Sequence, residues 1–441
     1  MLQTQIEYQR THLDNGICVV SEAVPSTNSV GVSVLVDANP GDEAGDKSGL
    51  AHFCEHSLFL GTPLRDQTSL TRLIDSAGGQ LGAFTAPDYT CFYAHVLQDY
   101  TSYAVDLLGD ILVSSNYPEE LLEREKDVIS QEIRGGDDQP LGFLTQRIKQ
   151  TLWPDQRISR PVLGTVDSVR GLCRSDVVSF VSRHYTPDRI TVAAAGAIDH
   201  ASFVEQVQDA FWTLRGHGPE RPKETIQPVG GVTVDAAGGE QAYFSIAIPI
   251  PAYADAGRYG LHVLNALLGG GLSSRLQVKL RDELGLVYFV QSSLLAYRDG
   301  GCLLIEGSCS AETLQPVLEQ ALFELAGLAL WQRPVDEEEL WKTTMQVTGQ
   351  TQLASDIISN RVSRLATQQF HFGQRIEDQR IVQAIDDVSL EKLQNQCLTM
   401  LAPGFKHLSI AVKTPHALGK EASSVCSGIN ELRDSFVAVS E

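Results

Sequence analysis

Short apolar stretches that could form strands recur in both halves of the chain. In the first half they alternate as a half-buried strand does at 17–20 and 30–36, and in the second half at 243–248. Further strand signals are found at 190–195, 302–305 and 408–412. Longer segments of helical character lie between them, at 100–114, 118–134, 311–328 and 336–352. Strands clustered with long helices inside each half predict an α+β fold in which helices cover sheets.

A stretch rich in glycine, proline and charge at 216–223 is the clearest break in this pattern. We predict an N-terminal domain at 1–215, a linker at 216–228 and a C-terminal domain at 229–441. In each half the chain runs from a strand through a polar turn into an apolar helix. The segment Gly49-Leu50-Ala51-His52 resembles Gly260-Leu261-His262-Val263, which indicates an internal repeat. The alternative is a coincidence between two ordinary core helices.

The overall composition excludes some classes of function. The chain has 441 residues and a formal net charge of −21, with the apolar content of a globular protein. The sequence has no basic run or stripe, so we expect no binding to nucleic acid. The acidity either serves solubility or gives a negative interior that attracts cationic peptides.

Location and redox state follow from what the sequence contains. No apolar stretch reaches the roughly 20 residues that span a bilayer, and we expect no membrane association. The stretch 1–7 has neither a secretory nor a transit profile. We therefore expect a cytoplasmic protein from a bacterium, or a mature form already trimmed. The eight cysteines form no C-x-x-C pair, so we expect reduced and mostly buried thiols.

The most specific chemical signal is an H-x-x-E-H motif formed by His52, Glu55 and His56. It lies in the apolar run 50–60, which contains no glycine or proline and is expected to be helical. Because a helix turns about 100° per residue, two imidazoles four positions apart can hold one metal ion. Glu55 lies on the flank of that face, and Cys54 points away into the core. The alternative is three polar residues on a solvated helix face.

A catalytic zinc site needs a third protein ligand, and the predicted helix 118–134 offers candidates. Glu125 and Glu132 are two helical turns apart and share a face. One of them can bind the metal while the other orients a ligand by hydrogen bonding. Glu123 lies roughly half a turn out of phase with Glu132 and is a poor candidate. Spacing alone does not separate this role from that of ordinary solvated glutamates.

Taken together, these segments resemble the pitrilysin/insulinase family of inverzincin zinc peptidases. The resemblance points to the short two-domain subgroup that includes the β subunit of the mitochondrial processing peptidase, and it covers nearly the whole chain. The matching segments are 49–62, 78–85, 125–132, 160–165, 185–188, 268–276 and 281–288. The resemblance implies two similar tandem domains, each a mainly antiparallel β-sheet covered by helices.

The resemblance also implies a role for each site residue. His52, His56 and Glu132 would hold a zinc ion (Zn2+), with Glu125 in the supporting place. Glu55 would take a proton from the attacking water. Arg281 and Tyr288 would offer hydrogen-bond donors to the substrate carbonyl. A strand would pair with an extended peptide substrate through Leu81, Gly82, Ala83, Phe84 and Thr85.

By the same resemblance, the chain is expected to be a zinc metalloendopeptidase. It would cleave unfolded peptides or precursor peptides inside a chamber built from two chains. One chain carries both the zinc motif and the Arg281 and Tyr288 pair, which favours a homodimer over a heterodimer with a related subunit. Gly82 stands where the family usually has Asn, and this departure bears on the efficiency or specificity of cleavage. The alternative function is a non-catalytic structural or assembly subunit of the same fold, against which the complete set of site residues argues.

Overall fold

The computed structural model describes residues 6–76, 78–221, 225–237, 240–415 and 422–439. Part of the predicted linker, at 222–224, and the first five residues lie outside the described residues. The chain divides into two compact units. The first comprises Met1–Arg134, Arg160–Lys223 and Leu353–Ile376, and the second comprises Gly135–Ser159, Glu224–Gln352 and Glu377–Glu441. In the described part of the chain, no helix combines the length and apolar character that crossing a membrane requires.

The first unit contains a six-stranded sheet in the order β1-β2-β6-β3-β5-β4. Only β2 and β6 run parallel, and the other neighbours are antiparallel. Its strands are β1 (Glu7–His12), β2 (Cys18–Ala23), β3 (Ser29–Val36), β4 (Gln80–Thr85), β5 (Thr90–Leu97) and β6 (Ile190–Gly196). Its helices are α1 (Leu50–Leu58), α2 (Gln67–Ser76), α3 (Thr101–Ser114), α4 (Glu119–Asp137), α6 (Val166–Arg170), α7 (Arg174–His184), α8 (His200–Ala210) and α12 (Ile358–Phe372).

The second unit contains a five-stranded sheet in the order β7-β11-β8-β10-β9, in which only β7 and β11 run parallel. Its strands are β7 (Gly231–Ala237), β8 (Gln241–Ile250), β9 (Val287–Ala296), β10 (Gly301–Ser310) and β11 (Ser409–Pro415). Its helices are α5 (Pro140–Leu152), α9 (Arg258–Leu268), α10 (Leu314–Ala329), α11 (Glu337–Ser355), α13 (Asp378–Asp386), α14 (Leu390–Gln396) and α15 (Ala422–Val439).

Both sheets follow one plan. If β1 is set aside and the strands of each sheet are counted along the chain from one to five, both sheets have the order 1-5-2-4-3. In the first sheet this is β2-β6-β3-β5-β4, and in the second it is β7-β11-β8-β10-β9. In both units a helix, α1 or α9, follows the second strand of this plan. The prediction of two similar α+β domains with mainly antiparallel sheets is therefore confirmed, and the shared plan agrees with the internal repeat.

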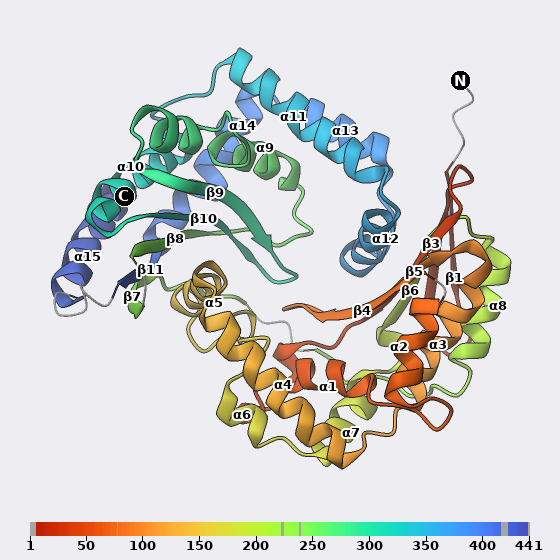
Figure 1. The fold of residues 1–441 in the computed structure, drawn as a ribbon. Helices are drawn as coiled ribbons and strands as arrows, with labels where there is room; N and C mark the ends of the chain where they lie inside the picture. Colours follow the sequence, from red (N-terminus) through yellow and green to blue (C-terminus); the bar gives the residue numbers. More distant parts are fainter. Residues whose placement is uncertain (1–5, 77, 222–224, 238–239, 416–421, 440–441) are drawn as a thin grey trace. The chain divides into compact units, whose positions relative to one another are not determined.

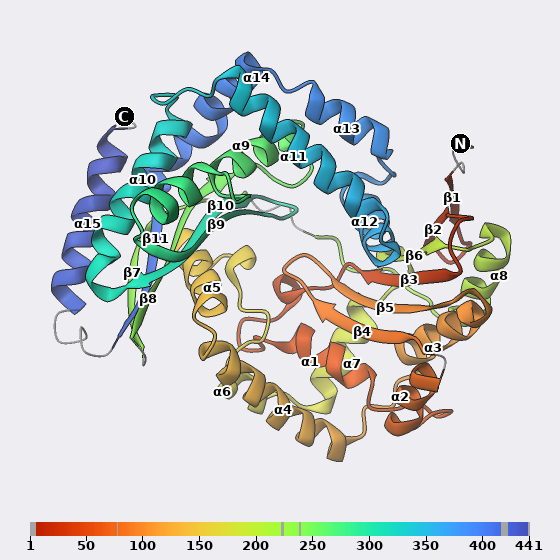
Figure 2. The ribbon, with the colours of Figure 1, turned by 45° about the horizontal axis from the view of Figure 1, so that its top comes forward.

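Each sheet is covered on both faces, which is why its central strands are buried throughout. In β3 the valines at 30, 32, 34 and 36 join the core under α1 and α3. Leu35 faces the other way and packs with Val362 of α12, so α12 covers the opposite face (Figure 1). In the second unit α9 and α10 cover one face, and α5 covers the other through Leu144, Ile148 and Leu152 (Figure 2).

The helices α5 and α12 show that the two units are not continuous segments of chain. Helix α5 comes from the N-terminal half of the sequence and packs on the sheet of the second unit. Helix α12 comes from the C-terminal half and packs on the sheet of the first. An apolar helix face does not specify which sheet covers it, so neither placement could be predicted from the sequence. The division at 1–215, 216–228 and 229–441 stays a prediction about domains.

Candidate metal centre

Helix α1 carries the H-x-x-E-H motif, and its start is fixed by two residues. Gly49 has a φ of 89°, in the left-handed region, and a Cβ there would lie 2.6 Å from the carbonyl oxygen of Leu163. The buried carboxyl of Glu43 accepts hydrogen bonds from the backbone N–H of Gly49, at 3.1 Å, and of Ala51, at 2.9 Å. Burial raises the pKa of Glu43 to about 8. These contacts satisfy N–H groups that a helix start leaves without partners.

One face of α1 belongs to the core of the first unit. Leu50, Phe53, Cys54 and Leu58 are all buried in this core. The expectation that Cys54 packs in the core is confirmed. Burying this face fixes the rotation of the helix and leaves the motif side chains on the other side.

The structure brings His52, His56 and Glu132 together. The Nε2 atom of His52 lies 3.8 Å from Oε2 of Glu132, and Nε2 of His56 lies 3.6 Å from the same oxygen. One ligand atom from each residue lies within 4.8 Å of the others, so the group could hold a metal ion. Two imidazole nitrogens and one carboxylate oxygen are a donor set that catalytic zinc uses. The donors therefore fit the metal that the sequence predicts.

The surroundings shift the pKa values of the two imidazoles in opposite directions. Burial, followed by the charge of His56, lowers the pKa of His52 to about 3, so this ring is neutral at neutral pH and keeps a lone pair free. Burial also lowers the pKa of His56, but the hydrogen bond to Glu125 and the nearby carboxylates outweigh burial and raise it. Glu125 Oε2 lies 3.0 Å from Nδ1 of His56. Because a carboxylate only accepts, the Nδ1 proton points to Glu125 and Nε2 is directed at Glu132.

Glu55 is buried beside this group and touches the edge strand of the sheet. The hydroxyl of Thr85, the last residue of β4, donates to Glu55 Oε2 at 2.6 Å. Burial raises the pKa of Glu55, the hydrogen bond from Thr85 lowers it, and the charge of Glu132 raises it further, with a net upward shift. A carboxyl group with a raised pKa is suited to proton transfer near neutral pH.

The two glutamates of α4 differ in exposure as well as in contacts. The side chain of Glu125 is 15% exposed, and that of Glu132 is 43% exposed. Glu125 is thus held behind His56, while Glu132 stands at the open side of the group. Spacing in the sequence did not distinguish these two glutamates, whereas their exposure and contacts do.

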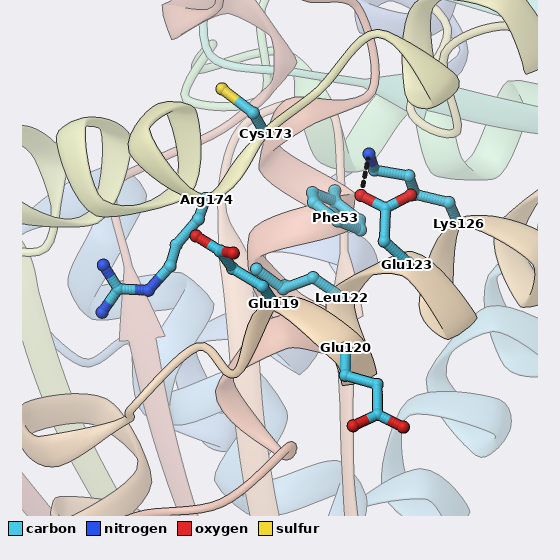
Figure 3. A pocket seen from close by; sticks show the side chains of 8 residues that line it. All are labelled: Phe53, Glu119, Glu120, Leu122, Glu123, Lys126, Cys173 and Arg174. Carbon is cyan, nitrogen blue, oxygen red and sulfur yellow. Dashed lines mark hydrogen bonds and ion pairs between the residues drawn. The ribbon is translucent and has the colours of Figure 1, made fainter.

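Glu123 lies on another side of α4, in a separate hollow of about 380 Å³ (Figure 3). There its carboxylate accepts a hydrogen bond from the amine of Lys126 at 2.6 Å. The residues that line this hollow are Phe53, Glu119, Glu120, Leu122, Glu123, Lys126, Cys173 and Arg174. The expectation that Glu123 is a poor candidate for the third ligand is confirmed.

The strand predicted to bind substrate is β4, at the edge of the first sheet. It pairs with β5, with Gly82 opposite Tyr93 and Thr85 opposite Thr90. Leu81 and Ala83 pack against the core on the side of α1. Because side chains alternate along a strand, Gly82 and Phe84 face the other side of the sheet. The edge strand β4 therefore has one face that points toward α1, the helix of the H-x-x-E-H motif, and a second face that carries aromatic side chains.

The remaining predicted site residues lie in the second unit. Arg281 is exposed in the π-helical segment Gln277–Glu283, and Tyr288, near the start of β9, is 80% exposed. Their action at the metal centre stays a prediction.

Sequence reasoning missed Glu43 and the bond between Thr85 and Glu55. An acidic residue shortly before a helix is a weak signal for Glu43, but the irregular loop between them hides the spacing. Thr85 was expected to contact substrate, and no pattern in the sequence relates it to Glu55.

Two family models and several curated relatives match the chain. A family model described as Insulinase (Peptidase family M16) matches residues 18–166, and a model described as Peptidase M16 inactive domain matches residues 172–346. An uncharacterized zinc protease of Mycobacterium tuberculosis is 34% identical over 413 residues, covering 92% of this chain and 93% of the relative. An uncharacterized zinc protease of Bacillus subtilis is 29% identical over 385 residues, with coverage of 87% and 93%.

Two solved structures share the fold. A protease from Helicobacter pylori superposes with a TM-score of 0.84 at 21% identity, covering 93% of this chain and all of that one (100%). A peptidase M16 inactive domain from Pseudomonas fluorescens gives a TM-score of 0.86 at 16% identity, with coverage of 93% and 98%. At such identities these two structures support the fold alone.

Proposed function

Because the chain belongs to the insulinase family of peptidases, family M16, we propose that it is a zinc-dependent endopeptidase that cleaves unfolded or precursor peptides. The observation that carries this proposal is the convergence of His52, His56 and Glu132, with the buried Glu55 beside them. That relatives are named zinc proteases supports zinc as the metal.

In this proposal His52, His56 and Glu132 hold the zinc ion, and Glu125 fixes the ring of His56. A zinc ion bound there would polarise the peptide carbonyl and lower the pKa of a water molecule. Glu55 accepts the proton of the attacking water and passes it to the leaving amine. The hydrogen bond from Thr85 keeps the carboxyl of Glu55 in one orientation for both transfers.

We assign peptide binding to β4. Within its sheet this strand pairs on one side with β5 and is the last strand of the order. An extended peptide can continue the sheet by adding to such an edge through backbone hydrogen bonds. Since Thr85 of this strand contacts Glu55, a peptide bound here would run close to the proposed base.

The test is the substitution Glu55→Gln, which keeps the size of the side chain and removes its basicity. We expect unchanged zinc content, and cleavage of a mixed peptide pool slowed by about 10²- to 10⁴-fold. Glu120→Gln on the exposed face of α4 is the matched control and should cleave at the wild-type rate. Activity of Glu55→Gln near that of the wild type would remove Glu55 from the mechanism. Zinc-loaded wild-type protein that cleaves nothing would favour the structural subunit.

We further propose a homodimer in which Arg281 and Tyr288 of one chain complete the zinc site of the other. Glu55→Gln and Arg281→Ala variants would each be inactive alone. After mixing and exchange of subunits, heterodimers would hold one intact site, with about a quarter of wild-type activity under random pairing. Mixing without any recovery, under conditions in which exchange is measured directly, would place both elements within one chain.

A further inference from the structure

Gly82 has no side chain, and a tyrosine from the neighbouring strand occupies the space that a side chain would need. A Cβ atom at position 82 would lie 2.5 Å from the hydroxyl oxygen of Tyr93 and 2.7 Å from the ring carbon that bears it. Real Cβ atoms do not come so close to other atoms, and the backbone of Gly82 is not in the left-handed region. A side chain at position 82 would therefore displace the ring of Tyr93, whereas the turn of the chain places no demand for glycine here.

The position of this ring brings it over the edge of the sheet. Tyr93 lies opposite Gly82 in the register of β5 and β4, and its hydroxyl is the atom nearest to the missing Cβ. The side chain thus extends from β5 across β4, the outermost strand. Its phenol ring lies where the side chain of an edge residue would otherwise stand.

Tyr93 and Phe84 together form an exposed aromatic surface, which we call the Tyr93 ledge. Their ring centroids are 6.4 Å apart, and they are 37% and 41% exposed. Phe84 also contacts Tyr89 at 6.1 Å, and Tyr89 contacts Phe370 of α12 at 5.3 Å. Further rings therefore pack behind Phe84, and Phe84 in turn contacts the ring of Tyr93.

The ledge lies on the face of β4 that points away from α1. Leu81, Ala83 and Thr85 point toward α1, and Gly82 and Phe84 alternate with them along the strand. A peptide that adds to β4 places its side chains alternately on the two faces. Those on the face of the ledge lie next to Phe84 and the ring of Tyr93, within the reach of cross-strand neighbours. A large apolar or aromatic side chain there would cover both rings, whereas a small or charged one would not.

We propose that the Tyr93 ledge is a specificity-determining subsite that selects peptides with a large apolar or aromatic residue on the side of the strand opposite the metal. This inference rests on the proposed function, since it concerns the substrate of the same site. It also gives a physical reason for Gly82, because any larger residue there would displace the ring.

The experiment compares cleavage-site profiles from a mixed peptide pool by mass spectrometry, for the wild type, Tyr93→Ala, Tyr93→Phe and Gly82→Asn. Wild-type cleavage sites should be enriched in Phe, Tyr, Trp, Leu or Met at one fixed position. Tyr93→Ala should lose this enrichment, with kcat/KM about 10-fold lower for a peptide with Phe at that position and nearly unchanged for the same peptide with Ala. Tyr93→Phe keeps the ring and should keep the preference. Gly82→Asn should lose it, because the new Cβ takes the space of the Tyr93 hydroxyl.

Tyr100→Ala, an exposed tyrosine outside the ledge, is the control and should keep the wild-type profile. Zinc content and thermal unfolding identify any variant that fails to fold. An unchanged profile in folded Tyr93→Ala and Gly82→Asn would overturn the ledge while leaving the peptidase intact. A wild type that cleaves no peptide would instead overturn the proposed function.

Discussion

At the scale of single residues, the candidate centre depends on which atom each side chain presents. Glu132 offers one oxygen to Nε2 of both His52 and His56, whereas Glu125 meets Nδ1 of His56. The two carboxylates come from one face of one helix, but they meet different atoms of the His56 ring. Glu125 contacts Nδ1, and Glu132 lies near Nε2. The hydrogen bond that Glu125 accepts from Nδ1 selects the tautomer of His56 that leaves Nε2 free.

Glu125→Ala should weaken zinc binding by about 10- to 100-fold without unfolding the protein, because His56 loses the group that orients it. Glu125→Gln should lose less affinity, since its amide oxygen still accepts the Nδ1 proton. Competition with a chelator of known affinity measures both, and Glu120→Ala provides the control on the same helix. Equal affinities for Glu125→Ala and the wild type would show that the contact is incidental.

How far the sequence predicts the site also depends on spacing. The four-residue interval between His52 and His56 fixes a shared helix face, so their proximity was predictable. Glu132 comes from a separate helix, and only the packing of α4 brings it to the same place. Glu43 and Tyr93 carry no motif, because their importance comes from atoms of distant backbone and of a neighbouring strand that no local pattern encodes.

At the scale of elements, helix α12 packs on β3 at a glycine. A Cβ on Gly31 would lie 2.9 Å from a methyl group of Val362, so the helix rests directly on the strand. A buried ion pair also joins this helix to the sheet. Glu22 of β2 accepts hydrogen bonds from Arg361, at 3.1 Å, and from Arg375.

Gly31→Ala should destabilise the first unit by about 1–3 kcal/mol, because the stiff valine side chain cannot move aside freely. Val362→Ala in the same chain should recover part of this loss by removing the opposing methyl groups. Urea unfolding of both variants gives the two free energies. Gly142→Ala on α5, where a Cβ would meet nothing within 4 Å, should not destabilise the protein. A loss in Gly31→Ala that Val362→Ala does not reduce would contradict the steric explanation.

Helix α5 carries a buried charge toward the second sheet. Lys149 is buried, and its burial lowers its pKa from 10.5 to about 8, against a small opposing effect from Cys302. Below pH 8 the amine is charged in both folded and unfolded chains, and burying it costs stability. Between pH 8 and 10.5 the unfolded chain holds more protons than the folded one, so stability rises with pH.

Lys149→Met should therefore stabilise the second unit at pH 7, by about 1–3 kcal/mol. The advantage of this variant over the wild type should shrink as the pH rises from 8 to 10.5. Urea unfolding at pH 7, 9 and 10 measures the difference, in which the titration of all other groups cancels. A difference that stays constant over this range would mean that Lys149 is not charged at a cost in the folded protein.

Elements were predictable where one physical pattern acts alone. Strands at 190–195 and 243–248 were expected from their apolar runs and are present as β6 and β8. The partners of α5 and α12 were not predictable, because an apolar face fits any apolar sheet. What decides the match is detailed shape, such as the contact between Gly31 and Val362.

At the scale of the whole molecule, the two sheets share one strand order, but the helices α1 and α9 at equivalent places carry different residues. In the alignment of the repeat, His52, Glu55 and His56 correspond to Val263, Ala266 and Leu267. These three residues of α9 are buried in the core of the second unit. The second copy of the fold thus has apolar core residues where the first has the H-x-x-E-H motif.

We therefore expect one zinc ion per chain. Metal analysis of purified protein after dialysis should give one equivalent, and His52→Ala combined with Glu132→Ala should remove it. Glu120→Ala should retain it. A second equivalent that survives the double substitution would reveal a metal site outside the first unit.

The late position of α12 in the sequence has a consequence for synthesis. The sheet face that carries Val20, Leu35 and Ala193 is covered by residues of α12, which the ribosome adds only after more than 350 others. Until then the nascent N-terminal half has an apolar sheet face that its own residues do not cover. We therefore expect the first unit to complete its core only after most of the polypeptide has been synthesised, and a chain that ends before α12 to leave this sheet face exposed.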